Sequence, residues 1–248
     1  MMAAHRRSPG ALVVALSLAT TLAVASLASN AFAGPDWEEG PTDAGSTLGT
    51  AQVINTSSTV NTITGKLTGT ALLAGDYQDC FLIQISDPTV FSLSTSPGLG
   101  GPPGFDPMMF LFRVDNNQGQ LVAKAIMANN DKSAGNPQAG LQRNTNDGSG
   151  TFLNDPGLYL IAISGFGSQP INASGQFLFN QEFLTPGVIA GPNASQQMSD
   201  YLLAGWASDG SFGTYTMTVS GVSGTQAPAP SALSLLALGG LARRRRQR

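Results

Sequence analysis

The sequence predicts an all-β fold for the body of this chain, and three observations support that prediction. No long segment between residues 34 and 226 carries the 3.6-residue apolar period of an amphipathic helix. Short runs that alternate apolar and polar residues are set off by Gly, Pro, Asn and Asp, which is typical of strands and turns. The body is also rich in Gly, Thr, Ser and Asn. At about 190 residues, it is long enough to bury the core of one domain.

The first strands follow from the alternation. Residues 60 to 67 place Ile63 and Leu67 on the face opposite Val60. Residues 76 to 95 give the strongest signal, because Phe81, Ile83 and Ile85 share one face of a strand. Asp87-Pro88 then supplies a turn, and residues 90 to 95 run back. We therefore expect an antiparallel hairpin here.

The later strands are marked by apolar runs and turn residues. Residues 108 to 114 form a continuous apolar run, which indicates a buried strand, and residues 120 to 128 return after a turn that ends at Gly119. Asp155-Pro-Gly157 opens the next strand, at residues 158 to 164. Residues 165 to 210 are an insertion of mixed character. Residues 213 to 221 alternate cleanly and form the closing strand.

Residues 1 to 33 have the three parts of a secretory signal. His5, Arg6 and Arg7 form a positive start, residues 11 to 28 an apolar core, and Ala31-Phe32-Ala33 a cleavage site before Gly34. Signal peptidase is the partner that this pattern implies, although an uncleaved N-terminal anchor is the alternative. We expect an exported protein with a mature N-terminus at Gly34.

The C-terminal end has the order of a sorting signal. Pro228-Ala229-Pro230 is followed by an apolar run from Ala232 to Ala242 and by Arg243, Arg244, Arg245 and Arg246. Eleven helical residues reach about 16 Å, well short of a hydrocarbon core of roughly 30 Å. The Arg cluster stays at the cytoplasmic face and is attracted to anionic lipid. The tail is therefore expected to associate transiently with a membrane, unless it is only a frayed end with a basic terminus.

This order resembles the PEP-CTERM sorting signals of exported bacterial proteins, with Ala229 in the place of the Glu. The resemblance implies processing by a membrane transpeptidase of the exosortase type. It also implies a location in the cell envelope, at the outer surface or outside the cell. Exopolysaccharide or matrix proteins are the further partners that it suggests.

Charge and composition exclude several functions of the mature body. Between the two ends lie five Lys and Arg and all 15 acids, a formal charge of −10, which gives no electrostatic footprint for nucleic acid. The only histidine, His5, leaves with the signal, so Ser-His-Asp, Cys-His and imidazole-zinc sites are excluded. Cys80 is the only cysteine, so no intramolecular disulfide forms. We expect it to be buried as a small apolar side chain.

The order of short motifs in the body resembles the bacterial pre-peptidase C-terminal domain. The motifs are Asp79-Cys-Phe81, Phe91-Ser-Leu-Ser, Asp106-Pro, Asn130-Asp131, Pro156-Gly-Leu-Tyr159 and the closing Gly-Thr-Tyr-Thr strand. The resemblance implies a small β-sandwich. We expect an antiparallel, jelly-roll-like arrangement with an insertion before the last strand, and the basic pattern of the family does not explain that insertion. The resemblance also implies a binding or accessory module without catalytic residues.

The expected organisation has five parts. Residues 1–33 are the signal peptide, 34–45 an acidic leader that is mobile apart from Trp37, and 46–222 the β-sandwich domain. Residues 223–231 are a linker with the Pro-Ala-Pro box, and 232–248 are the apolar segment and Arg-rich tail. A signal helix and a short apolar helix thus flank the domain.

Candidate sites are few. Asp106, Asn130 and Asp131 are the best candidates for calcium, which takes about six to eight oxygen ligands, and Asn129, Asp147 and Asp155 come next. The same residue types are ordinary turn formers, and that alternative stays open. Trp37, Tyr201 and Trp206 are either sugar-stacking residues or anchors. No cofactor other than Ca²⁺ is expected.

Two functions remain open. The leading hypothesis is a noncatalytic exported protein that presents a β-sandwich for adhesion, matrix assembly, or glycan or protein binding. The alternative is a secreted polysaccharide-active hydrolase that uses acidic residues. Nothing in the sequence holds two carboxylates at the ~5 to 10 Å separation that glycoside hydrolysis requires.

Overall fold

The computed structural model describes residues 36–69, 75–97, 105–193 and 200–225. Both terminal helices predicted from the sequence lie outside these residues. So do the cleavage residues Ala31, Ala33 and Gly34 and the sorting residues Pro228 to Pro230 and Arg243 to Arg246. Within the described residues, no helix has the length and apolar character needed to cross a membrane.

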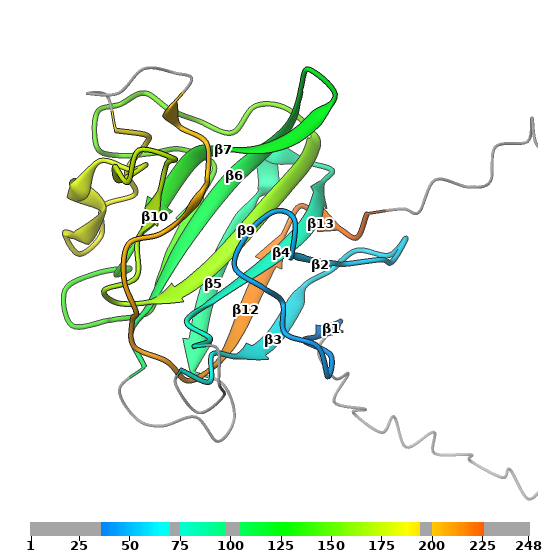
Figure 1. Ribbon diagram of the computed structural model, residues 1–248, viewed down its shortest axis with the longest axis horizontal. Helices are drawn as coiled ribbons and strands as arrows, with labels where there is room; N and C mark the ends of the chain where they lie inside the picture. Colours follow the sequence, from blue (N-terminus) through cyan, green and yellow to red (C-terminus); the bar gives the residue numbers. More distant parts are fainter. Residues whose placement is uncertain (1–35, 70–74, 98–104, 194–199, 226–248) are drawn as a thin grey trace, which may run out of the picture. The chain divides into compact units, whose positions relative to one another are not determined.

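Strands dominate the described residues, so the predicted all-β class is confirmed (Figure 1). The elements are β1 (Trp37–Glu38), β2 (Gln52–Val53), β3 (Thr62–Lys66), β4 (Gln78–Ile85), η1 (Pro88–Val90), β5 (Ser92–Pro97), β6 (Pro107–Asn117), β7 (Gln120–Asn129), β8 (Gly140–Gln142), β9 (Gly157–Gly165), β10 (Pro170–Ile171), η2 (Gln181–Leu184), β11 (Gly205–Trp206), β12 (Thr214–Ser220) and β13 (Val222–Ser223).

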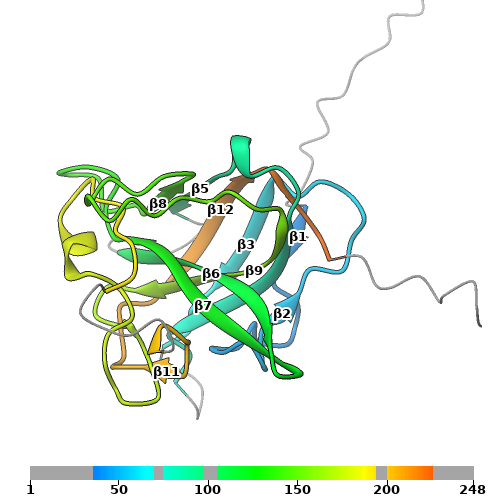
Figure 2. The same cartoon turned by 90° about the horizontal axis from the view of Figure 1, so that it is seen from above.

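Two main sheets make up the fold. A five-stranded sheet has the order β1-β3-β12-β5-β8. A six-stranded sheet has the order β13-β4-β9-β6-β7, and its sixth strand, β2, also pairs with β4. Figure 2 shows β5, β12 and β3 in one layer and β6, β7 and β9 in another. Most strand pairs are antiparallel, but β1 pairs with β3 and β2 with β4 in parallel. The sheets are therefore mixed, and the expectation of purely antiparallel pairing is wrong.

The core between the sheets is built from alternate residues of each strand. Phe81, Ile83 and Ile85 of β4 join Tyr215 and Met217 of β12 in one apolar cluster, and all five are buried. The face predicted for β4 is therefore correct. Tyr215 and Met217 of β12 lie on one inward face, as the predicted alternation of this strand allows, since side chains on a strand alternate between its two faces.

A second apolar cluster covers the outer face of the six-stranded sheet. The insertion supplies Phe179 and Phe183, whose rings pack against Phe110 of β6 at centroid distances of 5.5 and 5.8 Å. Trp206 of β11 packs on the same ring at 5.5 Å. Because both faces of β6 are covered, its sequence is a continuous apolar run rather than an alternating one.

The β6–β7 hairpin is confirmed. Its register runs from Met109 opposite Asn129 to Asn117 opposite Gln120, which leaves Gln118 and Gly119 as the loop. Both have positive φ, at 53° and 90°, as the tight turns favoured by hairpins require. The turn residues of the sequence therefore set the length of this hairpin.

The predicted hairpin over residues 76 to 95 is wrong. β4 pairs with β9 in the six-stranded sheet, whereas β5 pairs with β12 and β8 in the five-stranded sheet. Asp87 caps η1 by accepting from the backbone N–H of Thr89, and this short helix joins the two layers. Both strands still place their apolar residues in the shared core, which is why the local pattern resembles a hairpin.

The acidic leader is not mobile over its described residues. β1 pairs with β3, with Trp37 opposite Ile63 and Glu38 opposite Thr64. The Trp37 indole donates to Gln52 Oε1 at 2.6 Å and packs against the inner core, as expected for an anchor. The leader therefore adds an edge strand to the five-stranded sheet.

Candidate functional site

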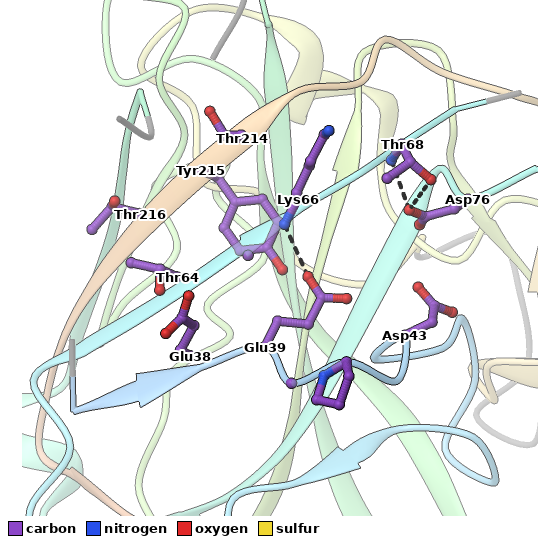
Figure 3. A pocket seen from close by; sticks show the side chains of 13 residues that line it. Glu38, Glu39, Asp43, Thr64, Lys66, Thr68, Asp76, Thr214, Tyr215 and Thr216 are labelled. Carbon is purple, nitrogen blue, oxygen red and sulfur yellow. Dashed lines mark hydrogen bonds between the residues drawn. The ribbon is translucent and has the colours of Figure 1, made fainter. Parts of the chain in front are cut away.

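The candidate site is a cavity of about 560 Å³ at the edge where the leader meets the sheets (Figure 3). Glu39, Asp43 and Asp76 line the cavity. Asp79 is fully buried and does not line it, but one of its oxygens lies within 4.8 Å of an oxygen of Glu39 and of Asp43. We call the cavity together with Asp79 the acidic pocket. The remaining lining residues come from the leader, from the segment around β3, and from β12: Glu38, Gly40, Pro41, Thr64, Gly65, Lys66, Thr68, Thr214, Tyr215 and Thr216.

Backbone donors hold Glu39 in place. The chain continues the pairing of β1 by one residue, because Glu39 N–H donates to Thr64 O at 2.8 Å. One carboxylate oxygen of Glu39 then accepts from Ala44 N–H at 3.2 Å, and the other from Lys66 N–H at 2.9 Å. The carboxylate is thus fixed against β3, while the Lys66 side chain points away from it (Figure 3).

Asp79 is the buried member of the acidic pocket. It lies near the start of β4, on the same inward face as Phe81, and has no exposed surface. Tyr215 Oη donates to Asp79 Oδ2 at 2.6 Å. Asp79 Oδ1 is buried without a hydrogen-bond partner. An unpartnered buried carboxylate oxygen is costly, and either a proton or a cation relieves that cost.

Three carboxylates converge at this point. One oxygen each from Glu39, Asp43 and Asp79 lies within 4.8 Å of the others. Asp76 adds a further charge, since one of its oxygens accepts from Thr68 N–H and Oγ1 at 2.7 and 2.8 Å and the other is buried without a partner. Four acids therefore surround one small volume.

Electrostatics in the acidic pocket are unbalanced. Burial, followed by the nearby Glu39 carboxylate, raises the pKa of Asp79 well above its ordinary value. Burial also raises the pKa of Glu39 and of Asp43, and their carboxylate neighbours add to both shifts. Arg113 forms the two ion pairs found within the described ranges, with Asp115 and Asp155. No Lys or Arg in those ranges therefore forms an ion pair with the acids of the pocket.

The arrangement fits a hard divalent cation. Two ligands of Ca²⁺ at 2.3 to 2.6 Å are at most about 5 Å apart, and the separations of up to 4.8 Å lie within that limit. Carboxylate oxygens suit Ca²⁺ or Mg²⁺, whereas no thiolate or imidazole is present for a softer metal. Glu39, Asp43 and Asp79 are the residues that would hold the ion, with Asp76 beside them.

The residues predicted as calcium ligands lie elsewhere. Asp106 precedes β6, and Asn130 and Asp131 follow β7, so these three come together at one end of the β6–β7 hairpin. The secondary candidates are occupied by other partners. Asn129 bonds backbone groups of Asp131, Gly140 and Val188, Asp147 accepts from Ser149 and Gly191, and Asp155 pairs with Arg113.

The aromatic candidates serve as anchors. The Trp206 indole donates to Ser46 O at 2.6 Å and its ring packs in the outer cluster, where Tyr201 is also partly buried. Cys80 is fully buried as expected, and burial raises the pKa of its thiol well above the ordinary range. None of these side chains joins the acidic pocket.

Sequence reasoning missed the acidic pocket. The leader carries Asp36, Glu38, Glu39 and Asp43, and this density of acids was the available signal. What it could not indicate is that Asp79, many residues further along the chain, lies under the leader. Comparison of the chain with protein-family models, curated proteins and solved structures gives no match.

Proposed function

We propose that this is a noncatalytic exported protein, sorted to the cell envelope or matrix by its two ends, whose β domain is a calcium-dependent binding module. One observation carries the calcium dependence: three carboxylates converge at the acidic pocket without a cationic partner among the described residues, where a buried oxygen of Asp79 also has no hydrogen-bond partner. We propose further that the domain is a jelly-roll-like sandwich of the pre-peptidase C-terminal type. Its role is adhesion, matrix assembly, or glycan or protein binding.

A cation in the acidic pocket would join three separate parts of the chain. Glu39 and Asp43 belong to the leader, Asp79 belongs to β4, and Tyr215 of β12 holds Asp79. Binding would neutralise charges that otherwise repel one another, and so would fasten the leader to both sheets. Since Ca²⁺ is plentiful outside cells, the module would reach its full stability after export.

The acidic pocket favours cation binding over polysaccharide hydrolysis. Hydrolysis requires two carboxyl groups about 5 to 5.5 Å or 6.5 to 9.5 Å apart that both reach the glycosidic bond. Asp79 has no exposed surface, and backbone donors already occupy both oxygens of Glu39. The tail and the signal, which support export, give no preference for an enzyme.

The test is calcium binding by the mature protein. Asp43→Asn is the principal variant, because Asp43 is exposed and Asn keeps an oxygen that can accept from Gly45 N–H. Tb³⁺ luminescence sensitised by Tyr215 and calorimetry with Ca²⁺ should both report a site that Asp43→Asn weakens. Asp209→Asn, an exposed acid outside the acidic pocket, is the matched control.

Calcium should also stabilise the fold. At a hundredfold excess over Kd, a ligand that binds only the folded state contributes about 2.7 kcal/mol. Equal binding by the Asp43→Asn and Asp209→Asn proteins would refute the assignment of the ion to this pocket. Bond cleavage in polysaccharides that a single Asp→Asn or Glu→Gln change abolishes would overturn the noncatalytic proposal, and a glycan array with and without Ca²⁺ tests the binding role.

A further inference from the structure

The strand ends that carry Asp106, Asn130 and Asp131, which we call the Asp106 cluster, show a second place where a cation fits. The register of the hairpin pairs Met109 with Asn129. Continued by one residue, it sets Asn130 beside Met108, whose side chain belongs to the outer cluster. Because side chains alternate along a strand, Asp106 and Asn130 then project to the same face as Met108.

Each member of the Asp106 cluster has a buried oxygen with no partner. These atoms are Asp106 Oδ1, Asn130 Oδ1 and Asp131 Oδ1. Asn130 is only 3% exposed, so water does not freely satisfy its amide oxygen. A buried acceptor without a donor is destabilising, and a cation could serve as the shared partner of three such acceptors at adjoining strand ends.

Asp106 and Asp131 carry like charges at the adjoining ends of β6 and β7. Burial, followed by the charge of Asp131, raises the pKa of Asp106 from 3.8 to about 6. Lys132 is the cation nearest in sequence, but its Nζ donates to Ser94 Oγ and to Thr95 O instead. The charges of the Asp106 cluster are therefore not neutralised by that side chain.

The backbone of the same residues holds the insertion. Asp106 O accepts from Phe166 N–H at 2.7 Å and from Ser211 Oγ at 3.0 Å, at the two ends of the insertion. Asn130 N–H donates to Phe183 O at 3.2 Å, and Asp131 O accepts from Gly187 N–H at 2.8 Å, both in its middle. Whatever fixes the Asp106 cluster therefore also fixes the insertion.

We propose that Asp106, Asn130 and Asp131 bind a second hard divalent cation, Ca²⁺ by its ligand chemistry, and that this ion fastens the insertion to the ends of β6 and β7. The ligand set is two carboxylates and one amide oxygen, which suits Ca²⁺, with water filling the remaining positions. This site is independent of the acidic pocket and does not rest on the proposed function.

The experiment is hydrogen exchange on the mature protein in Ca²⁺ and in chelator, with peptides that cover residues 166 to 191. Calcium should slow exchange there at least threefold in the unaltered protein and in Asp43→Asn. The slowing should be lost in Asp131→Asn and in Asp106→Asn. Asn130→Asp, which keeps an oxygen ligand, should retain it, whereas Asn130→Leu should not.

The two sites give distinguishable outcomes. Slowing confined to residues 36 to 45, or slowing at residues 166 to 191 that Asp131→Asn leaves unchanged, overturns the second site. Asp106→Asn removes a repulsion, so without calcium it should melt no lower than the unaltered protein. A lower melting temperature in chelator would mean that the carboxylate has a purely structural role, and this too would overturn the proposal.

Discussion

Replacing Gly65 by Ala should disrupt the acidic pocket from the inside. Gly65 of β3 lies opposite Tyr215 of β12. A Cβ at this position would lie 2.2 Å from Tyr215 Oη and 2.6 Å from Glu39 Oε2, closer than real Cβ atoms come to other atoms. The Tyr215 ring would have to move, and its hydrogen bond to Asp79 would break.

The expected cost can be worked from these contacts. Overpacking costs about 1 to 3 kcal/mol, and the loss of a hydrogen bond to a buried group costs about 1 to 3 kcal/mol. Replacing a glycine within a strand by alanine stabilises the folded state by roughly 0.5 to 1 kcal/mol, which offsets part of this cost. Gly65→Ala should therefore lower the free energy of unfolding by roughly 1 to 5 kcal/mol. For a domain of this size, the melting temperature should fall by about 2 to 20 °C.

Urea unfolding of the mature protein measures this change. Gly49→Ala is the matched control, because nothing lies within 4 Å of a Cβ added there. In a Tyr215→Phe background, which lacks the hydroxyl, Gly65→Ala should cost about 1 to 3 kcal/mol less, since the hydrogen bond is already absent. Equal free energies of unfolding of the Gly65→Ala and Gly49→Ala proteins would refute the predicted displacement of the Tyr215 ring.

Further predictions concern pH, the outer cluster and the two ends of the chain. In cation-free buffer, the free energy of unfolding should fall as pH rises from about 4 to about 6. The pKa of Asp106 is raised to about 6 in the folded protein, so in this range folded Asp106 keeps a proton that the unfolded chain has lost. Urea titrations at a series of pH values measure this fall. Phe110→Ala should lower the free energy of unfolding by about 3 to 5 kcal/mol, measured in the same way, since its ring anchors the insertion. Mass spectrometry of exported protein should give Gly34 as the first residue. Replacing Arg243 to Arg246 by Gln should release more protein to the medium, measured by fractionation, because each Arg near anionic lipid contributes about 1 kcal/mol.

A specific experimental result would contradict each of these four predictions. The pH prediction is wrong if Asp106→Asn leaves the slope between pH 4 and 6 unchanged. A loss under 1 kcal/mol in Phe110→Ala would mean that the outer cluster does not hold the insertion. Exported protein that retains residues 11 to 28 would contradict cleavage, and unchanged partitioning of the Arg-to-Gln protein would count against the sorting signal.

Much of the fold could be predicted because alternation is local. Phe81 and Ile83 share a buried face whatever strand pairs with theirs, and the same holds for Tyr215 and Met217. The β6–β7 hairpin was predictable because its two strands are joined by a tight turn at Gln118 and Gly119. The formal charge of residues 34 to 226 likewise needs no structure.

Pairing between distant strands was not predictable from the same patterns. β4 and β5 are consecutive in the chain, yet they lie in different sheets, because β4 pairs with β9 and β5 pairs with β12. An inward apolar face satisfies either arrangement equally well. The choice depends on long-range packing, which a local pattern does not contain.

The candidate sites divide along the same line. The sequence alone grouped Asp106, Asn130 and Asp131 as candidate ligands, because residues at the two ends of one hairpin lie side by side. Only the tertiary structure brought Glu39 and Asp43 of the leader over Asp79 of β4, since this requires the parallel pairing of β1 with β3 and the reach of Tyr215 from β12. Residue types therefore determined which chemistry was available, and the folded chain decided which carboxylates lie within reach of one ion.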